Sequence, residues 1–296
     1  MNAIVFGGSG FLGSHVADAL TNAGHRVRIY DIRQSEHLNS KQEMIVGDIL
    51  DGQNVRNAVK DMDVIYNFAG IADIDEASRK PIETIKYNVL GNVILLDAAV
   101  KEKIRRFIYA STVYVYSDSG SFYRCSKIAC ENYIEAFQKQ YGLSYTILRY
   151  GTLYGSRADI HNSIRRFITQ AMTDGKITYP GNGEEIREYI NVIDAAMASV
   201  EILSPDFENE HVIFTGHYPM KVKDLLLMIR EILKKDIFIE YVMPKSEDPM
   251  DHYMITPYTF IPKIGKKYVK NYYTDMGQGL LICMQEIYDK LNNSQA

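Results

Sequence analysis

Short apolar runs alternate with longer amphipathic segments along the first half of the chain. The short runs are typical of strands buried on both faces of a parallel sheet. The longer segments repeat apolar residues every three or four positions, as packed helices do. The predicted strands are residues 3–6, 27–31, 44–46, 63–67, 106–111 and 144–149. This alternation predicts an α/β fold with a Rossmann-type, doubly wound parallel sheet in the strand order 3-2-1-4-5-6.

The pattern loosens after about residue 155. Helices are predicted at 164–173, 222–233 and from Gly277, and strands at 176–179, 186–192, 212–214 and 237–242. We therefore expect a Rossmann domain over residues 1–155 and a smaller α/β lobe, mainly substrate-binding, over residues 156–296. Some segments, such as 186–203, are expected to return to the Rossmann core. Because no flexible linker separates the halves, the lobe should pack against the domain and form one wall of the cleft.

Composition narrows the class of protein. A hydrophobic content of 46%, a charged content of 24% and a net charge of −4 are ordinary for a globular protein, and no dense basic stretch suggests nucleic acid. Cys125, Cys130 and Cys283 have neither disulfide nor metal-ligand spacing, which indicates thiols in a reducing compartment. No signal peptide or apolar run of membrane-spanning length is present. We expect a cytoplasmic protein with no metal, nucleic-acid or membrane partner.

A glycine-rich turn joins the first predicted strand to the first predicted helix. Its glycines follow the spacing G-x-x-G-x-x-G. In that setting Gly7 allows a tight turn, Gly10 lets the backbone approach a pyrophosphate, and Gly13 lets the helix pack closely on the sheet. The phosphates would then bind amides at the helix N-terminus, so Phe11 and Leu12 join the predicted cofactor contacts. A plain glycine turn is the alternative, which the strand and helix on either side disfavour.

Asp31 ends the second predicted strand, 18 residues beyond Gly13. A carboxylate at this place can accept hydrogen bonds from the adenosine ribose and repels a 2′-phosphate. The predicted cofactor is therefore NAD. Arg33 keeps NADP open as an alternative, because its side chain could pair with a 2′-phosphate.

A Tyr-x-x-x-Lys pair begins the helix that follows the fifth predicted strand. Spacing of four places Tyr123 and Lys127 one above the other on a helix, and the ammonium should lower the pKa of Tyr123. Thr112, at the carboxyl end of the strand, can offer a hydroxyl to the same substrate atom. Together the three groups can move a proton to or from an alcohol or carbonyl. Because the chain holds 22 tyrosines, an ordinary surface pair is the alternative, which the nearby dinucleotide motif disfavours.

These motifs together resemble the extended short-chain dehydrogenase/reductase family, specifically its nucleotide-sugar epimerases and related enzymes. The resemblance covers most of residues 1–200. It rests on GGSGFLG at 7–13, Asp31, GDILD at 47–51, NFAG at 67–70, YNVLGN at 87–92, STVYVYS at 111–117, the Tyr123 and Lys127 pair, RYGTLYG at 149–155 and REYINVIDAA at 187–196.

The resemblance implies a role for each matching residue. Lys127 would bond the nicotinamide ribose, Tyr123 would be the catalytic acid and base, and Thr112 would hold the family's catalytic Ser/Thr position. The remaining cofactor contacts are expected at Asp48 and Ile49, against adenine, and at Phe68, Ala69 and Gly70, after the fourth strand.

Substrate contacts and assembly also follow from the resemblance. Arg187 falls where the family binds the nucleotide diphosphate, a task that suits a guanidinium fork. Thr152 replaces an asparagine with which these epimerases often hold the substrate. Relatives usually form homodimers through the helices that here would be residues 87–101 and 123–141.

The chain also departs from the family. The loop at 117–122 is much shorter than usual, which predicts a larger or unusual sugar. Val113-Tyr114 stands where dehydratases carry an Asp-Glu pair, and the glutamate of the decarboxylases is missing as well. Near residues 247–252 no second phosphate-binding arginine is present. Three lysines could replace it or could simply form a solvated basic loop: Lys263, Lys266 and Lys267.

The predicted function is NAD-dependent oxidation at C4 of a nucleotide-linked sugar, as a nucleotide-sugar 4-epimerase. A 4-dehydrogenase or 4-ketoreductase with net hydride transfer is one alternative. A non-catalytic nucleotide-binding protein on the same fold is another, because fold alone never proves activity. The base and the sugar are not determined, and residues 245–275 are where we expect that choice to be made.

Overall fold

The computed structural model describes residues 1–242, 252–257, 265–269 and 272–293. The chain divides into two compact units. Unit 1 comprises Met1–Tyr150, Ala195–Phe214 and Pro257–Tyr268, and unit 2 comprises Gly151–Asp194, Thr215–Thr256 and Val269–Ala296. The first division thus follows Tyr150 rather than residue 155. Of the segment 186–203, only the part from Ala195 onward lies in unit 1.

Unit 1 is built on an eight-stranded sheet in which every pair of neighbouring strands is parallel. Its order is β13-β10-β6-β5-β4-β1-β2-β3. The predicted order 3-2-1-4-5-6 is confirmed, and β10 and β13 extend the sheet beyond β6. The strands are β1 (Asn2–Phe6), β2 (Arg26–Asp31), β3 (Gln42–Val46), β4 (Val64–Asn67), β5 (Arg106–Thr112), β6 (Tyr145–Tyr150), β10 (Glu210–Phe214) and β13 (Lys266–Lys267).

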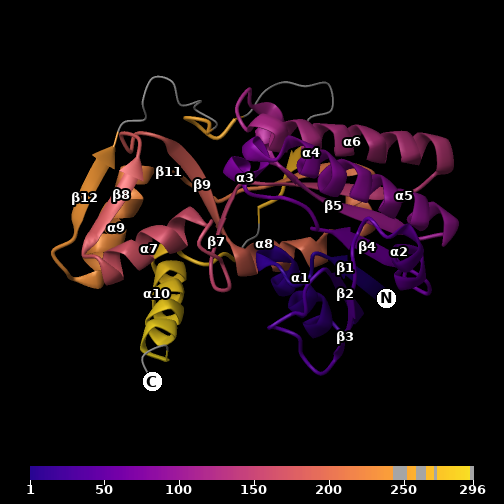
Figure 1. The fold of residues 1–296 in the computed structure, drawn as a ribbon, viewed down its shortest axis with the longest axis horizontal. Helices are drawn as coiled ribbons and strands as arrows, with labels where there is room; N and C mark the ends of the chain where they lie inside the picture. The colour runs from indigo at the N-terminus through magenta and orange to yellow at the C-terminus, as the bar shows by residue number, and fades with distance from the viewer. Residues whose placement is uncertain (243–251, 258–264, 270–271, 294–296) are drawn as a thin grey trace. The chain divides into compact units, whose positions relative to one another are not determined.

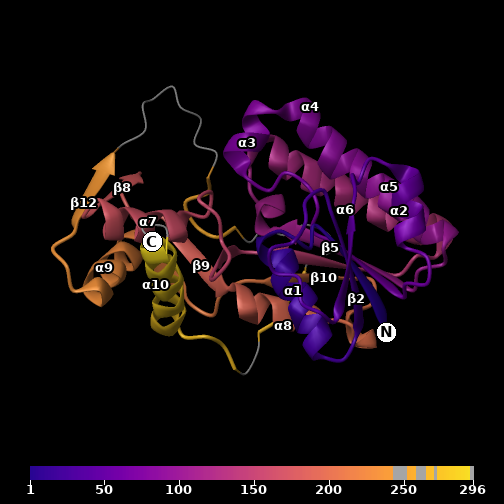
Figure 2. The same ribbon diagram turned by 60° about the horizontal axis from the view of Figure 1, so that its bottom comes forward.

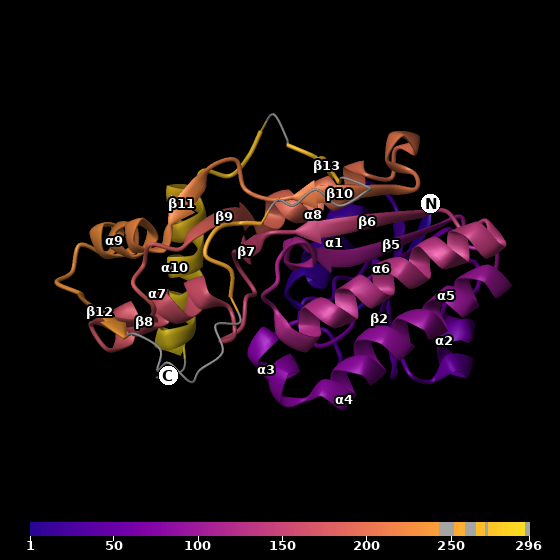
Figure 3. The same ribbon diagram turned by 90° about the horizontal axis from the view of Figure 1, so that it is seen from above.

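Helices cover both faces of this sheet. They are α1 (Phe11–Asn22), α2 (Gly52–Ala58), α3 (Ile74–Arg79), α4 (Pro81–Thr84), the π-helix η1 (Ile85–Leu90), α5 (Gly91–Lys101), the 3₁₀ turn η2 (Val113–Tyr116), α6 (Ser121–Tyr141), α8 (Val192–Glu201) and the 3₁₀ turn η3 (Pro205–Phe207). Figure 1 shows α5 and α6 along one face and α1 along the other. From above, β5, β6 and β10 run side by side next to α6 (Figure 3).

The helical segment from Pro81 to Lys101 is not one continuous α-helix. A π-helical stretch, η1, separates α4 from α5. A π-turn inserts an extra residue, which shifts the face of the helix and often marks a functional position. Here it carries Asn88, a buried polar residue that apolar periodicity cannot predict.

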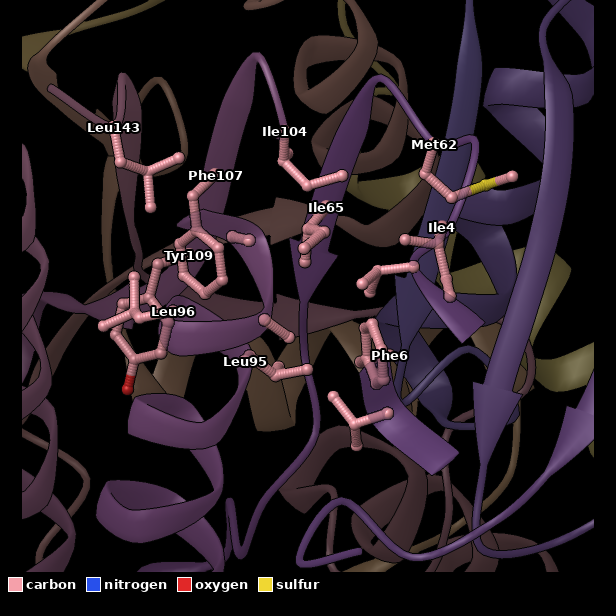
Figure 4. Close-up of a cluster of buried hydrophobic side chains, with 14 of the residues drawn as sticks. Ile4, Phe6, Met62, Ile65, Leu95, Leu96, Ile104, Phe107, Tyr109 and Leu143 are labelled. Atoms are coloured by element: carbon pink, nitrogen blue, oxygen red, sulfur yellow. The ribbon is translucent and has the colours of Figure 1, made fainter. Parts of the chain in front are cut away.

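The core of unit 1 lies between the sheet and α5. Ile4 and Phe6 of β1, Ile65 of β4, Phe107 of β5 and Leu95 of α5 are fully buried in one cluster (Figure 4). Burying each such side chain stabilises the fold by about 1.5–3 kcal/mol. The apolar strand centres leave the chemistry to the carboxyl ends of the strands.

Unit 2 has its own core. Its strands are β7 (Thr152–Tyr154), β8 (Lys176–Pro180), β9 (Ile186–Asn191), β11 (Pro219–Lys221) and β12 (Phe238–Val242), and its helices are α7 (Ser163–Thr173), α9 (Val222–Leu233) and α10 (Met276–Asn293). The strands form two small sheets, β11-β9-β7 and β12-β8. Figure 2 shows α7, α9 and α10 gathered with β8 and β12, and their apolar side chains form the core. The predicted helices are confirmed, whereas the short strands β7 and β11 were not predicted.

Candidate active site

The glycine turn between β1 and α1 leaves almost no room for side chains. Gly7 has a φ of +75°, and its N–H donates to the Tyr30 carbonyl at 2.9 Å. A Cβ on Gly7 would lie 2.7 Å from the Ala69 nitrogen, and one on Gly13 would overlap the Gly7 carbonyl oxygen. The first amides of α1, which begins at Phe11, have no intrahelical acceptor. The turn therefore fits a pyrophosphate that approaches the backbone. Gly10 lies in the turn as the N-cap of α1, and Leu12 lies in the first turn of that helix.

Asp31 lies beside this turn, at the end of β2. Its Oδ2 accepts from the Ser9 N–H at 3.0 Å, and its Oδ1 accepts from the Arg33 N–H at 3.1 Å. The Ser9 hydroxyl donates to the Arg33 carbonyl at 2.8 Å. The carboxylate is thus fixed next to the phosphate turn, where it suits a ribose and opposes a 2′-phosphate.

Asp48 and Ile49 lie in the loop that follows β3. Asp48 Oδ1 accepts from the Leu50 N–H at 2.9 Å, and its carbonyl accepts from the Tyr30 hydroxyl at 2.9 Å. Ile49 is only 7% exposed and packs in the main core. A contact of Ile49 with a cofactor would therefore come mainly from its backbone.

The loop after β4 contains Phe68, Ala69 and Gly70, and it is held by Asn88 of η1. Asn88 Oδ1 accepts from the Ile71 N–H at 2.7 Å, while its Nδ2 donates to the Ile71 carbonyl at 3.0 Å. Gly70 has a φ of +137°, and a Cβ there would lie 2.5 Å from Asn88 Oδ1.

Asn88 also reaches the helix that carries Tyr123. Its Nδ2 lies 2.9 Å from Ser126 Oγ, and the Ser126 hydroxyl donates to the Tyr123 carbonyl at 2.7 Å. Asn88 therefore ties the loop after β4 to α6. Asn88 lies within the YNVLGN motif, but the sequence pattern predicted no role for it.

Thr112, Tyr123 and Lys127 come together at the carboxyl end of β5. The Thr112 hydroxyl lies close enough to the Tyr123 phenol to act on its pKa. Lys127 Nζ donates to the Ala110 carbonyl at 2.7 Å and lies 5.5 Å from the centroid of the Tyr123 ring. Hydroxyl, phenol and ammonium thus meet in unit 1, as the spacing predicted.

The electrostatics differ from the prediction. Desolvation raises the pKa of Tyr123 to about 12, and the hydrogen bond with Thr112 opposes this rise. Burial lowers the pKa of Lys127 to about 8, opposed by Cys130 and Glu131. The predicted lowering of the Tyr123 pKa by Lys127 is therefore wrong for this structure. The ammonium lies beside the phenol ring and bonds a carbonyl, so desolvation of the phenol dominates.

Within unit 2, Thr152 and Arg187 meet at a third residue, Tyr253. The Arg187 guanidinium carbon lies 4.4 Å from the centroid of the Tyr253 ring, and the Tyr253 hydroxyl lies 3.5 Å from Thr152 Oγ1. Arg187 is 9% exposed, and its Nη1 donates to the Ile186 carbonyl at 3.0 Å and the Met254 carbonyl at 3.4 Å. A guanidinium oriented in this way can bind a phosphate through two hydrogen bonds. No sequence signal indicated Tyr253.

Several expected features lie outside the described residues or are engaged elsewhere. Glu247 and Lys263 fall outside them, as does much of the segment 245–275 in which sugar selection was expected. Lys266 forms an ion pair with Glu210 at 2.6 Å, within unit 1. Among the residues that the structure describes, no three His, Cys, Asp or Glu side chains gather as a metal site would require. Nor does any helix in those parts combine the length and apolarity needed to cross a bilayer.

Residues 3–214 match the model of the NAD dependent epimerase/dehydratase family. The chain belongs to that family. The resemblance to extended short-chain dehydrogenases/reductases is thereby confirmed, and the protein is an enzyme of the nucleotide-sugar epimerase and dehydratase class. NAD is its cofactor, which agrees with the closely packed glycine turn and the carboxylate of Asp31.

Individual relatives of this epimerase/dehydratase family differ in reaction. A putative UDP-glucose 4-epimerase from Methanocaldococcus jannaschii is 29% identical over 230 residues, which cover 71% of this chain and 75% of that protein. A UDP-N-acetyl-alpha-D-glucosaminuronate decarboxylase from Bacillus cytotoxicus is 31% identical and covers 70% of this chain and 72% of its own length. The solved UDP-glucose 4-epimerase of Thermotoga maritima, in complex with UDP-glucose, superposes with a TM-score of 0.85 at 25% identity, covering 98% of this chain and 100% of that one.

Proposed function

We propose that this protein is a nucleotide-sugar 4-epimerase, which oxidises C4 of a nucleotide-linked sugar with NAD and then reduces it again. The observation that carries this proposal is the meeting of Thr112, Tyr123 and Lys127 in the same unit as the glycine turn. Similarity to a putative UDP-glucose 4-epimerase and to a solved UDP-glucose 4-epimerase supports it.

The dinucleotide would be held by residues at the carboxyl ends of the first five strands. NAD, when bound, supplies the acceptor and donor of the hydride. The proposed contacts are Gly7, Gly10, Phe11, Leu12, Gly13, Asp31, Asp48, Ile49, Phe68, Ala69, Gly70, Tyr123 and Lys127.

Tyr123 is proposed to move the proton on the C4 oxygen. As a phenolate it would take the hydroxyl proton, with Lys127 compensating the negative charge and Thr112 hydrogen-bonding the reacting oxygen. As a phenol it would return that proton to the keto oxygen. With a pKa of about 12, the phenol is the resting form at neutral pH. The ammonium and the Thr112 hydroxyl must therefore favour the phenolate during oxidation.

Substrate binding and assembly are part of the same proposal. Arg187 would hold the nucleotide diphosphate, and Thr152 would bind the substrate beside Tyr253. Homodimers would form through residues 87–101 and 123–141. The three cysteines are free thiols, which fits a reducing cytoplasm.

A 4-ketoreductase is the second candidate. Its chemistry needs a protonated acid to deliver a proton to the keto oxygen, and the raised pKa of Tyr123 favours this form. A 4,6-dehydratase is disfavoured, because Val113 and Tyr114 cannot do the acid and base work of a carboxylate pair.

The test is Tyr123→Phe in the NAD-loaded protein, assayed for C4 chemistry on UDP and dTDP sugars. We expect turnover to fall by roughly 10²–10⁴-fold with cofactor binding retained, because only the proton-transferring hydroxyl is removed. Tyr288→Phe, at an exposed tyrosine of α10 outside the proposed site and dimer interface, is the matched control and should keep wild-type rates. Wild-type turnover in Tyr123→Phe would contradict the mechanism. A wild-type protein that binds sugar nucleotides but transfers no hydride would support the non-catalytic alternative.

A further inference from the structure

A second phenol lies beside the reactive one. The rings of Tyr114 and Tyr123 meet edge to face, with centroids 6.4 Å apart and an interplanar angle of 80°. The Tyr114 N–H also donates to Thr112 Oγ1 at 3.2 Å. Tyr114 therefore contacts two of the three residues to which the proton transfer is assigned.

The short loop between η2 and α6 holds this ring in place. The Ser117 N–H donates to the Tyr114 carbonyl at 2.9 Å, which turns the chain back at once. Gly120 has a φ of +105°, and a Cβ there would lie 2.7 Å from Tyr114 Cδ1. Ser121 follows with a φ of +46°. Two consecutive left-handed residues, one without a side chain, let the loop close onto the Tyr114 ring.

This packing changes the meaning of the shortened loop. A short loop alone predicts an open site that accepts a larger sugar. The partly buried Tyr114 ring instead fills space next to the Tyr123 side chain. Because the Tyr123 hydroxyl must meet the C4 oxygen, a ring at this separation is within reach of substituents on the carbons that flank C4.

We propose that Tyr114 is a specificity-determining residue whose ring packs against the substituent on C3 or C5 of the sugar. This inference rests on the proposed function at C4. The ring favours a small neutral substituent there and disfavours a carboxylate, because the face of an aromatic ring is electron-rich and offers an anion no hydrogen bond. The selected substrates are therefore nucleotide-linked sugars with hydroxyl or hydroxymethyl groups beside C4.

The test compares sugars that differ at one carbon. UDP-xylose, UDP-glucose and UDP-glucuronic acid form a C5 series, and UDP-glucose with UDP-3-deoxyglucose forms a C3 pair. UDP-glucose with UDP-N-acetylglucosamine differs at C2, which does not flank C4. Both kcat/KM and the Kd from calorimetry are measured with NAD-loaded wild type, Tyr114→Phe, Tyr114→Ala and Tyr114→Leu. Tyr288→Ala, on an exposed tyrosine of α10, is the control.

In Tyr114→Ala we expect the ratio of kcat/KM values between the sugars of the C5 series, or of the C3 pair, to change about tenfold or more. In the C5 series the change should favour UDP-glucuronic acid. The C2 ratio should stay within about threefold, and Tyr114→Phe should keep the wild-type ratios, because the ring remains. Tyr114→Leu gives the same reading if the alanine variant unfolds. Unchanged C3 and C5 ratios in both opened variants would overturn the assignment.

The two proposals fail separately. If wild type binds these nucleotides without C4 turnover, the proposed function falls, and the Kd ratios still decide the role of Tyr114. If wild type binds none of them, both proposals are overturned.

Discussion

At the scale of single residues, the largest electrostatic cost of the site falls on Lys127. Its ammonium is buried, and its pKa is about 8 instead of 10.5. Between about pH 8 and pH 10.5, Lys127 is therefore more fully protonated in the unfolded chain than in the folded protein. The free energy of unfolding therefore rises with pH from about 8 to 10.5, and the full cost of burial is present below pH 8.

Lys127→Met should separate this cost from catalysis. At pH 7 we expect turnover to fall by at least about 10²-fold. The free energy of unfolding should rise, because the cost of burying the ammonium, up to about 3 kcal/mol, is removed. Loss of the hydrogen bond to the Ala110 carbonyl reduces this gain by about 1 kcal/mol. Urea titrations at pH 7, 9 and 10.5 measure the difference in free energy of unfolding between Lys127→Met and the wild type. This difference should shrink with rising pH, because Lys127 loses its charge in the folded wild type. A methionine variant that is less stable by the same amount at every pH would contradict this account.

Short-range patterns predicted the residues that meet in unit 1 but not their energetics. Helical spacing linked Tyr123 to Lys127, and the end of a strand placed Thr112 beside them. The direction of the Tyr123 pKa shift was missed because desolvation depends on packing that no spacing encodes. Tyr253 was missed because its partner Arg187 is distant in sequence and no periodic pattern joins them.

At the scale of elements, a buried ion pair joins the parts that carry the catalytic residues. Arg149 of β6 donates to Glu131 of α6 through Nε at 3.0 Å and Nη2 at 2.6 Å. The Ser111 hydroxyl of β5 donates to Glu131 Oε1 at 2.5 Å, and Arg149 also donates to the Tyr116 hydroxyl of η2. Because both charges are nearly inaccessible, removing either one leaves the other buried and unpaired.

Glu131→Gln and Arg149→Met should each lower the free energy of unfolding by roughly 3–5 kcal/mol. The double variant should lose clearly less than the sum, because it buries no lone charge. Denaturant unfolding of all four proteins measures the coupling. Lys101→Met, which breaks the exposed pair with Asp97, is the control and should change stability by less than about 1 kcal/mol. Additive losses would show that the two charges do not act as a pair.

Element type was predicted better than element detail. The helical segment from Pro81 to Lys101 is interrupted by η1, where Asn88 bonds the loop after β4. Apolar periodicity predicts which face of a helix is buried, but it cannot predict a buried polar residue such as Asn88. The short strands β7, β11 and β13 gave no apolar run long enough to recognise.

At the scale of the whole molecule, the alternation of strands and helices along the sequence was enough to predict the strand order of the sheet. Connections between parallel strands are almost always right-handed, which leaves few other strand orders possible. The chain's division into two units was harder to place, since α8 begins in unit 2 and continues in unit 1. A helix shared in this way leaves no change in composition at the division.

The proposed homodimer is also tested at this scale. Leu90 of η1 and Tyr133 of α6 are 48% and 46% exposed, and both lie on segments assigned to the interface. We expect a solution mass of twice the chain by light scattering, and a single-chain mass for the double variant Leu90→Lys, Tyr133→Lys. Leu281→Lys, an exposed position on α10, should leave the mass unchanged. A monomeric wild type would refute the assembly.

The most direct test of C4 epimerisation follows the hydride. The purified, NAD-loaded protein is incubated with nucleotide sugars carrying deuterium at C4, while NMR follows the sugar and absorbance follows the reduced nicotinamide band. The account predicts an inverted C4 centre that keeps its deuterium, with no net change in absorbance. Net growth or loss of the reduced band would identify a dehydrogenase or ketoreductase instead. An unaltered sugar with unaltered cofactor across the panel would contradict the central claim.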